Sequence, residues 1–211
     1  MPAPPSHHAT AEATTEPSLE NLLQQVRACT LCAPYLPLGP HPVLQAGARA
    51  RILIASQAPG RKAHATGIPF DDASGERLRH WLQLPRQLFY ERQLVAILPM
   101  GFCYPGQGAS GDAPPRPECA PTWRTPLLAQ LAQLQLTLAV GRYAIAWHLP
   151  EHRHRPLAEV IRASIQPGSK VLALPHPSPR NNIWLRQHPW FEAEALPLLR
   201  QRVAAALHGQ I

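Results

Sequence analysis

The sequence predicts an α/β fold: a three-layer α/β/α sandwich around a four-stranded, mainly parallel sheet. Three observations predict it. Four short apolar runs have the composition of buried parallel strands, amphipathic helical patterns lie between most of them, and loops rich in Pro and Gly follow several of them. Strands that alternate with helices are typical of parallel sheets. A chain of 211 residues is long enough to bury the core of such a domain.

The elements can be placed in order along the chain. Residues 1–17 are rich in Pro, Ala, His and Thr, so we expect a disordered tail before a single domain at 18–211. Apolar runs predict strands at 51–55, 94–98, 134–140 and 171–174. Amphipathic patterns predict helices at 18–27, from a cap at Ser74 through Leu82, and at 118–133, 143–149 and 189–207.

Three unusual loops each follow a predicted strand: 56–70, 99–119 and 175–182. Crossovers between parallel strands are right-handed, so the carboxyl ends of the strands share one edge of the sheet. Ligands of such sheets bind outside that edge. We therefore expect the three loops to line one cleft.

The overall charge indicates a polyanionic partner. The formal net charge is +7, with arginines spread from Arg27 to Arg202 and no dense basic block. A basic protein with no nucleic-acid partner is the alternative. No apolar run approaches the ~18–20 residues of a membrane span, and no signal segment precedes the domain, so we expect a cytoplasmic monomer without a membrane partner.

The four cysteines form two pairs. Cys29 and Cys32 have the spacing C-x2-C, and Cys103 and Cys119 follow about seventy residues later. Disulfides are rare in a reducing compartment, so we expect a shared metal site that holds zinc or an iron–sulfur cluster. Four unrelated buried thiols are the alternative. The eleven histidines carry less information, and His148, His152 and His154 are expected in exposed loops.

The first loop combines a tight turn, Ala58-Pro59-Gly60, with the aromatic ring of Phe70 and the carboxylate of Asp72. A ring, a rigid turn and a carboxylate can hold a flat base and activate a water molecule. The structural alternative is that Phe70 belongs to the core and that Asp72 only caps the helix that begins near Ser74.

The last loop begins with His176 directly after a strand, and prolines stiffen it. A histidine at that position can donate to an oxygen that gains negative charge during a reaction. Arg180, Asn181 and Asn182 can contact phosphates or a groove of DNA. A rigid loop with a solvated histidine is the alternative.

Several motifs in this order resemble the uracil-DNA glycosylase superfamily, most closely its iron–sulfur branch, family 4. The resemblance runs from about Leu22 to Val203. It rests on these segments: Cys29-Thr-Leu-Cys32, Ile52-Leu-Ile-Ala-Ser-Gln-Ala-Pro-Gly60, Thr66-Gly-Ile-Pro-Phe70, Cys103 with Cys119, Val140-Gly141 and His176-Pro177-Ser178.

The resemblance implies hydrolysis of the N-glycosidic bond of uracil, or of another deaminated base, during base-excision repair of DNA. The base would be flipped out of the stack into the cleft. Phe70 would stack on it, and His176 would stabilise the departing uracil anion. The implied roles of the other residues are backbone contacts from Gln57, Ala58, Pro59 and Gly60, minor-groove contacts from Pro177, Ser178 and Arg180, and a 4Fe–4S cluster on Cys29, Cys32, Cys103 and Cys119.

The chain departs from the usual patterns of the superfamily at three positions. Gln57 stands where family 4 usually has Glu, and Pro99 stands where the superfamily usually reads uracil with Asn. Ala58 stands where several families carry a water-activating Asp or Asn, and family 4 also has a small residue there. The segment Asp72-Ala-Ser-Gly75 resembles a stretch of family 5, which predicts Asp72 as the water-activating carboxylate. Two alternatives follow from these departures: an iron–sulfur nucleic-acid-binding protein of the same fold with altered or lost catalysis, and a zinc-stabilised module with a small-molecule substrate.

Overall fold

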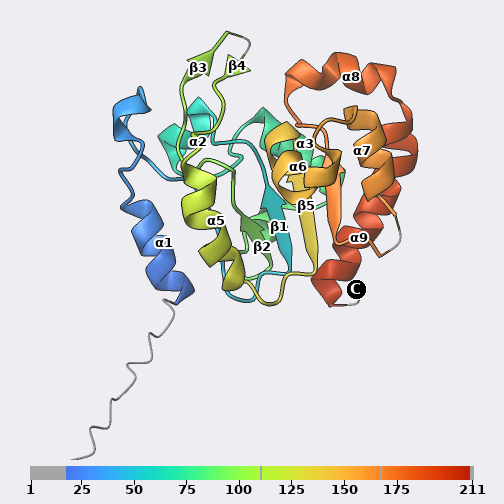
Figure 1. Ribbon diagram of the computed structural model, residues 1–211. Helices are drawn as coiled ribbons and strands as arrows, with labels where there is room; N and C mark the ends of the chain where they lie inside the picture. The colour runs from blue at the N-terminus through green and yellow to red at the C-terminus, as the bar shows by residue number, and fades with distance from the viewer. Residues whose placement is uncertain (1–17, 110, 167, 210–211) are drawn as a thin grey trace, which may run out of the picture.

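A computed structural model describes residues 18–109, 111–166 and 168–209 (Figure 1). The tail expected at residues 1–17 lies outside these ranges. Within them, no helix is both long and apolar enough to cross a membrane.

The central sheet confirms the predicted fold class. Its strands are β1 (Ile52–Ala55), β2 (Val95–Ile97), β5 (Leu136–Val140) and β6 (Val171–Leu174). They are parallel and lie in the order β2-β1-β5-β6. The chain moves outward from β1 to β2 and then returns to the other side of β1, so the topology switches direction between β1 and β5. A switch of this kind opens a crevice at the carboxyl ends of the strands.

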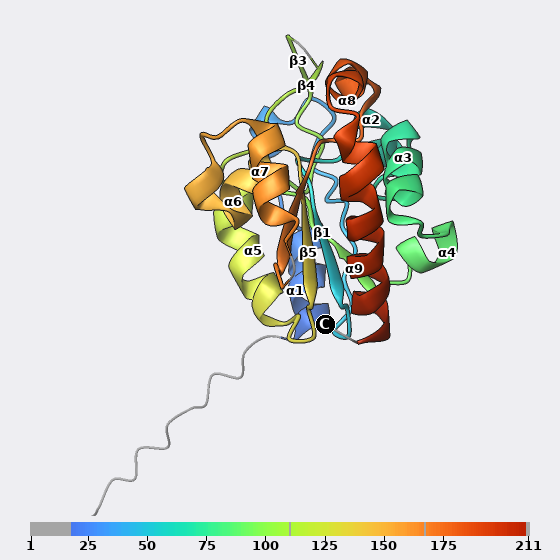
Figure 2. The ribbon, with the colours of Figure 1, turned by 90° about the vertical axis from the view of Figure 1, so that its right-hand side faces the viewer.

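Helices cover both faces of the sheet (Figure 2). On one side lie α3 (Ala73–Leu82), α4 (Arg86–Phe89) and α9 (Leu196–His208). On the other lie α1 (Leu19–Arg27), α5 (Cys119–Ala129), α6 (Arg142–His148) and α7 (Leu157–Ser164). The carboxyl ends of the strands point to the top of Figure 1, where α2 (Arg61–Thr66), α8 (Asn182–Gln187) and the hairpin of β3 (Gln107–Gly108) and β4 (Gly111–Asp112) lie.

Burial in the core explains how such short strands can form a stable sheet. All four residues of β1 are buried, because helices pack on both faces of this central strand. Ile52 and Ile54 join one apolar cluster with Trp81 and Phe191, while Leu53 joins a second cluster that includes α1. Each large apolar side chain buried in this way stabilises the fold by about 1.5–3 kcal/mol.

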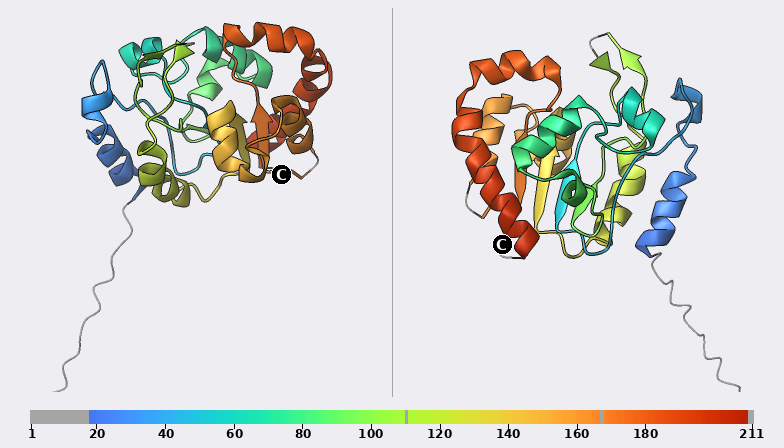
Figure 3. Two further views of the ribbon diagram at one scale, coloured as in Figure 1. Left: turned by 45° about the horizontal axis from the view of Figure 1, so that its top comes forward. Right: turned by 180° about the vertical axis from the view of Figure 1, so that it is seen from behind.

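Several local predictions were wrong. The predicted loop 56–70 contains the short helix α2. Asp72, not Ser74, caps α3, because its carboxylate oxygen Oδ1 accepts a hydrogen bond from the Gly75 N–H at 2.9 Å. The segment predicted as one helix at 189–207 begins with a wider π-type turn, Phe191–Ala195, before α9. The predicted loop 99–119 contains the β3–β4 hairpin, which rises above the sheet in the right-hand view of Figure 3.

The prediction of an exposed His148 was also wrong. His148 ends α6 and is half-buried, and its Nε2 lies 2.6 Å from an Nη2 of the fully buried Arg124. Burial and the nearby guanidinium lower the pKa of His148 to about 4, so the ring is neutral and accepts the hydrogen bond. Arg124 also donates to the carbonyls of Leu98 and Pro99, and thereby ties α5 to the end of β2.

Candidate active site at the carboxyl edge of the sheet

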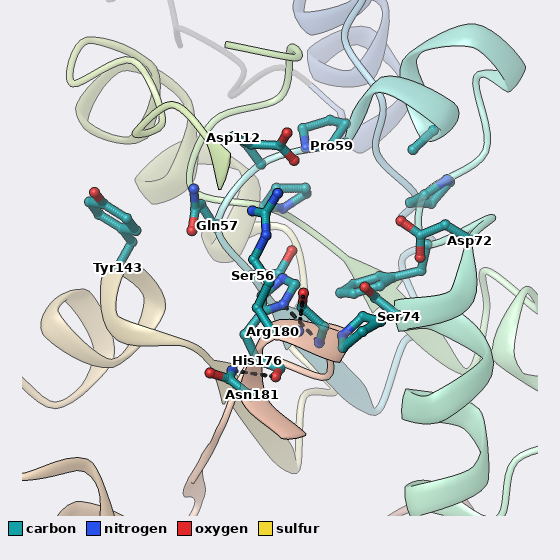
Figure 4. A pocket seen from close by; sticks show the side chains of 18 of the residues that line it. Ser56, Gln57, Pro59, Asp72, Ser74, Asp112, Tyr143, His176, Arg180 and Asn181 are labelled. Atoms are coloured by element: carbon teal, nitrogen blue, oxygen red, sulfur yellow. Dashed lines mark hydrogen bonds between the residues drawn. The ribbon is translucent and has the colours of Figure 1, made fainter. Parts of the chain in front are cut away.

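A cleft of about 660 Å³ opens where the four parallel strands end (Figure 4). Loops that follow each of the four strands line it. Ten of the catalytic and substrate-binding residues predicted from the sequence line this one cleft: Gln57, Ala58, Pro59, Gly60, Phe70, Asp72, His176, Ser178, Arg180 and Asn181. Pro177 and Asn182, which were also expected to contact DNA, are not among the residues that line it. The structure therefore brings together segments that lie more than one hundred residues apart in the chain.

The turn after β1 forms the floor of the cleft and is held by the loop after β2. The backbone N–H groups of Met100 and Gly101 donate to the carbonyls of Ser56 and Gln57, at 2.7 and 3.0 Å. The Gln57 side-chain amide donates to the Ala113 carbonyl at 3.1 Å, just beyond β4. The two loops therefore form one hydrogen-bonded unit.

Phe70 presents its ring from a constrained backbone. Its φ is +57°, a left-handed conformation that costs a non-glycine residue about 1–3 kcal/mol and is often found at functional sites. The ring is half-buried and packs edge-on against Phe89, with centroids 6.3 Å apart. Gly75 lies so close to the Phe70 carbonyl that a Cβ at position 75 would collide with it. The surroundings thus fix an aromatic surface in the wall of the cleft.

Asp72 both caps a helix and faces the cleft. Oδ1 accepts the Gly75 N–H at the start of α3, where the helix dipole favours a negative charge. Oδ2 is directed toward Gly60, at 3.7 Å from the point that a Cβ on Gly60 would occupy. The capping role and a role in the cleft therefore use different oxygen atoms and do not exclude each other.

His176 has a defined hydrogen-bonding state. Its Nδ1 accepts the backbone N–H of Ser178 at 3.2 Å, and its carbonyl accepts the side-chain amide of Asn181 at 2.7 Å. Burial lowers the pKa of His176; Arg180 lowers it further and Asp72 opposes the shift. The ring is therefore neutral at pH 7, and because Nδ1 is an acceptor, Nε2 carries the proton.

Sequence reasoning missed Asp112 at the rim of the cleft. The β3–β4 hairpin carries it, and Arg180 packs against the hairpin so closely that a Cβ on Gly111 would collide with the guanidinium. Figure 4 shows Asp112 beside Pro59, with the Arg180 side chain reaching toward it. The sequence does hold one signal for Asp112. It is the only carboxylate between Glu91 and Glu118, and this segment includes the loop that follows the second predicted strand. Arg142 and Tyr143 also line the cleft and were not predicted.

Pro99 lies in the cleft wall at the end of β2. Its side chain has no hydrogen-bonding group, and its carbonyl accepts from Arg124 at 3.2 Å. The side-chain amides that line the cleft belong to Gln57, in the loop after β1, and to Asn181, in the loop after β6. Any recognition of a base edge by a side-chain amide would therefore come from those loops.

The four cysteines surround a second, separate pocket between α1 and α5. Apolar side chains of Val26, Leu31, Leu36, Phe102 and Trp123 complete most of its wall. In residues 18–109, 111–166 and 168–209, no three His, Cys, Asp or Glu side chains meet closely enough to hold a single metal ion. The four thiols therefore line one pocket but do not converge on the position of a single ion.

Burial keeps three of the four thiols, those of Cys32, Cys103 and Cys119, protonated. Burial raises the pKa of Cys119 to about 12, and burial also raises the pKa of Cys32 and Cys103. The Phe102 N–H donates to Cys119 Sγ at 3.4 Å. Arg116 lies 4.2 Å above the Tyr35 ring beside the pocket and pairs with Glu118 at 2.8 Å. The pocket therefore offers four soft sulfur donors in apolar surroundings, with one N–H directed at a sulfur.

A comparison with known protein families matches the part of the chain that forms the cleft. A family model described as the uracil DNA glycosylase superfamily matches residues 44–200, most of the chain. The matched region begins before β1 and ends within α9, so it includes the whole sheet and every loop that lines the cleft. The chain therefore belongs to the uracil DNA glycosylase superfamily.

Proposed function

We propose that the protein is a DNA glycosylase that hydrolyses the N-glycosidic bond of uracil, or of another deaminated base, in base-excision repair. One observation carries the proposal: the Phe70 ring, the Asp72 carboxylate and the His176 imidazole line the same cleft. An aromatic face, a carboxylate and a neutral donor are the three groups that this reaction requires. The net charge of +7 suits a DNA partner, because phosphate contacts supply most non-specific affinity.

Each group has a distinct task in the proposed mechanism. A flipped base stacks on Phe70. Cleavage leaves negative charge on the O2 atom of uracil, and His176 donates its Nε2–H to that oxygen. A single preorganised donor of this kind lowers a barrier by about 3–4 kcal/mol in other enzymes. Asp72 steadies the positive character of the sugar and orients the water, as carboxylates do in glycoside hydrolysis.

The loop after β6 and the turn after β1 bind the DNA around the reacting nucleotide. Ser178 and Arg180 belong to the rim, where a long cation and backbone groups can contact phosphates or the minor groove. Arg77 of α3 donates to the Ser178 carbonyl at 3.2 Å and so supports this loop from below. Turn residues Gln57 to Gly60 offer backbone groups to the base.

We further propose that the four cysteines hold a 4Fe–4S cluster, as in the iron–sulfur branch of the superfamily. In such a cluster each thiolate binds a different iron, so the sulfur ligands surround a group instead of meeting at one ion. Four thiols around an apolar pocket, with the Phe102 N–H directed at Cys119, suit this arrangement. The pocket and the cleft share no lining residue, so the cluster would stabilise the fold rather than take part in the chemistry.

A DNA-binding protein of the same fold without glycosylase activity is the second candidate. Two residues favour it: Pro99 gives no side-chain donor at the end of β2, and Gln57 cannot act as a base. The neutral His176 argues for catalysis, because its Nε2–H has no hydrogen-bond partner among residues 18–109, 111–166 and 168–209.

An oligonucleotide panel tests the proposal. Deoxyuridine, deoxyinosine and deoxyxanthosine are placed in single- and double-stranded DNA, incubated with the full chain, and scored for abasic sites by alkaline cleavage. We expect at least one of these bases to be excised. Binding to all the oligonucleotides with no cleavage of any would favour the second candidate.

A further inference from the structure

Two carboxylates of the cleft face the same small space beside Gly60. A Cβ placed on Gly60 would lie 3.5 Å from Asp112 Oδ2 and 3.7 Å from Asp72 Oδ2. Gly60 has no side chain, so this space is open. The two aspartates come from different elements, β4 and the start of α3, and Figure 4 shows them on separate walls.

The two carboxylates have different surroundings. Asp72 is committed through Oδ1 to the helix cap. The carboxylate of Asp112 accepts no hydrogen bond and forms no ion pair within the part of the chain that the structure describes. Asp112 also stays exposed at the rim, so solvent water can reach it and a proton can leave it. Enzymes assign acid–base work to the member of a carboxylate pair that can change its charge.

The charged groups around Asp112 support an acid–base role for Asp112 rather than for Asp72. Partial loss of hydration raises the pKa of the Asp112 carboxyl; Asp72 raises it as well, and the Arg180 guanidinium opposes both effects. A carboxylate with a raised pKa is a stronger base than an ordinary aspartate, and general bases work best when their pKa lies near the working pH.

The hairpin holds Asp112 in position through two contacts outside its own strands. The Gln57 amide donates to the Ala113 carbonyl, next to Asp112, at 3.1 Å. Arg180 packs on Gly111, whose φ of +133° and lack of a side chain permit the contact. Asp112 is thereby connected both to the turn that contains Gly60 and to the loop that contains His176.

We propose that Asp112 is the general base of the reaction, and this inference rests on the proposed glycosylase function. The oxygen of a water molecule between the two carboxylates bonds to C1′ of the deoxyribose. The C1′–N bond breaks, and its electron pair leaves with the base. The proton of the water passes to Asp112 and then to solvent, while Asp72 keeps its charge beside the sugar.

Asp112→Asn tests the inference, because it keeps the shape of the side chain and removes the base. Single-turnover excision is measured from pH 5 to 9 with whichever oligonucleotide the wild type cleaves. We expect a rate about 10²-fold lower and loss of the rate increase between acidic and neutral pH, since general base catalysis typically contributes 10²–10⁴-fold. Asp112→Glu should recover part of the rate.

Asp71→Asn is the matched control, since Asp71 pairs with Arg86 at 3.1 Å and does not line the cleft. Thermal unfolding of each variant shows whether the fold is intact. An Asp112→Asn protein with the wild-type rate and pH profile contradicts the inference. So does a variant that changes only which base is excised, because Asp112 would then read the base. If the wild type cleaves nothing, the proposed function itself fails, and that result is distinct from both.

Discussion

The backbone N–H of Ser178 donates to Nδ1 of His176 at 3.2 Å, and this contact sets the tautomer of the imidazole. Because Nδ1 accepts, the proton of the neutral ring resides on Nε2. The low pKa of the buried His176 keeps the ring uncharged at neutral pH. In the proposed mechanism, the donor for the developing oxyanion is therefore in place before the substrate binds, and this group would need no reorganisation during the reaction.

Asp72→Asn separates the helix cap from the chemistry. Asn caps helices about as well as Asp, so we expect the melting temperature to change little. Excision should fall by at least tenfold, because the amide carries no charge to steady the sugar. Thermal unfolding and a single-turnover assay measure the two effects. Loss of stability with full activity in the remaining folded protein would assign Asp72 to the cap alone.

Phe70→Ala should weaken substrate binding. Stacking of a base on an aromatic ring contributes about 1–3 kcal/mol, so we expect roughly tenfold or greater loss of apparent affinity in a titration of the single-turnover rate. Phe70→Tyr should retain most of the affinity, since the ring remains. Leu88→Ala, at an exposed position outside the cleft, is the control. Equal affinities for Phe70→Ala and wild type would remove Phe70 from the site.

The metal content of the purified protein tests the cysteine pocket. We expect a brown protein with about four irons per chain and broad visible absorbance. Cys103→Ser should lose the colour and unfold at a lower temperature, whereas Thr30→Ala, between Cys29 and Cys32 but outside the pocket, should keep both. A colourless protein with one zinc per chain would contradict the cluster. Four thiols that react freely under native conditions, with no metal, would contradict any shared site.

The Arg124–His148 pair predicts how stability depends on pH. His148 has a pKa of about 4 in the folded protein and 6.5 in the reference state. Below pH 6.5 the unfolded chain therefore binds a proton that the folded chain does not, and the free energy of unfolding falls as the pH drops from 6.5 toward 4. The expected loss is roughly 3 kcal/mol.

His148→Gln measures that contribution, because glutamine can still accept from Arg124 but does not titrate. Urea unfolding at several pH values should show that the wild type loses more stability than the variant between pH 6.5 and 4. Parallel curves for the two proteins would mean that His148 does not carry this part of the pH dependence.

The sheet and the cleft could be predicted because their signals are local. Each strand is a short apolar run, and each functional loop follows such a run directly, so the rule for parallel sheets placed Phe70 and His176 together. The resemblance of the motifs added their chemical roles. The match of a family model to residues 44–200 then confirmed the superfamily.

What the sequence did not reveal depends on contacts across the fold. The β3–β4 hairpin has two residues per strand and no alternating pattern, so its position comes from Gln57 and Arg180 instead. Because the hairpin was not predicted, Asp112, which lies on β4, was not predicted as a site residue either. His148 was expected in solvent because histidine in a polar segment usually is, and only Arg124, twenty-four residues earlier, explains its burial. Ser74 and Asp72 are both good caps, and the geometry of the turn decided between them.

The most direct test of the central claim is the rate of base release from deoxyuridine-containing DNA by wild type and by His176→Ala, measured under single-turnover conditions. Loss of one preorganised donor should slow release by about 10²–10³-fold and leave DNA binding unchanged. His80→Ala, an exposed histidine on α3 outside the cleft, should match the wild type. A His176→Ala protein that releases the base at the wild-type rate would contradict the account.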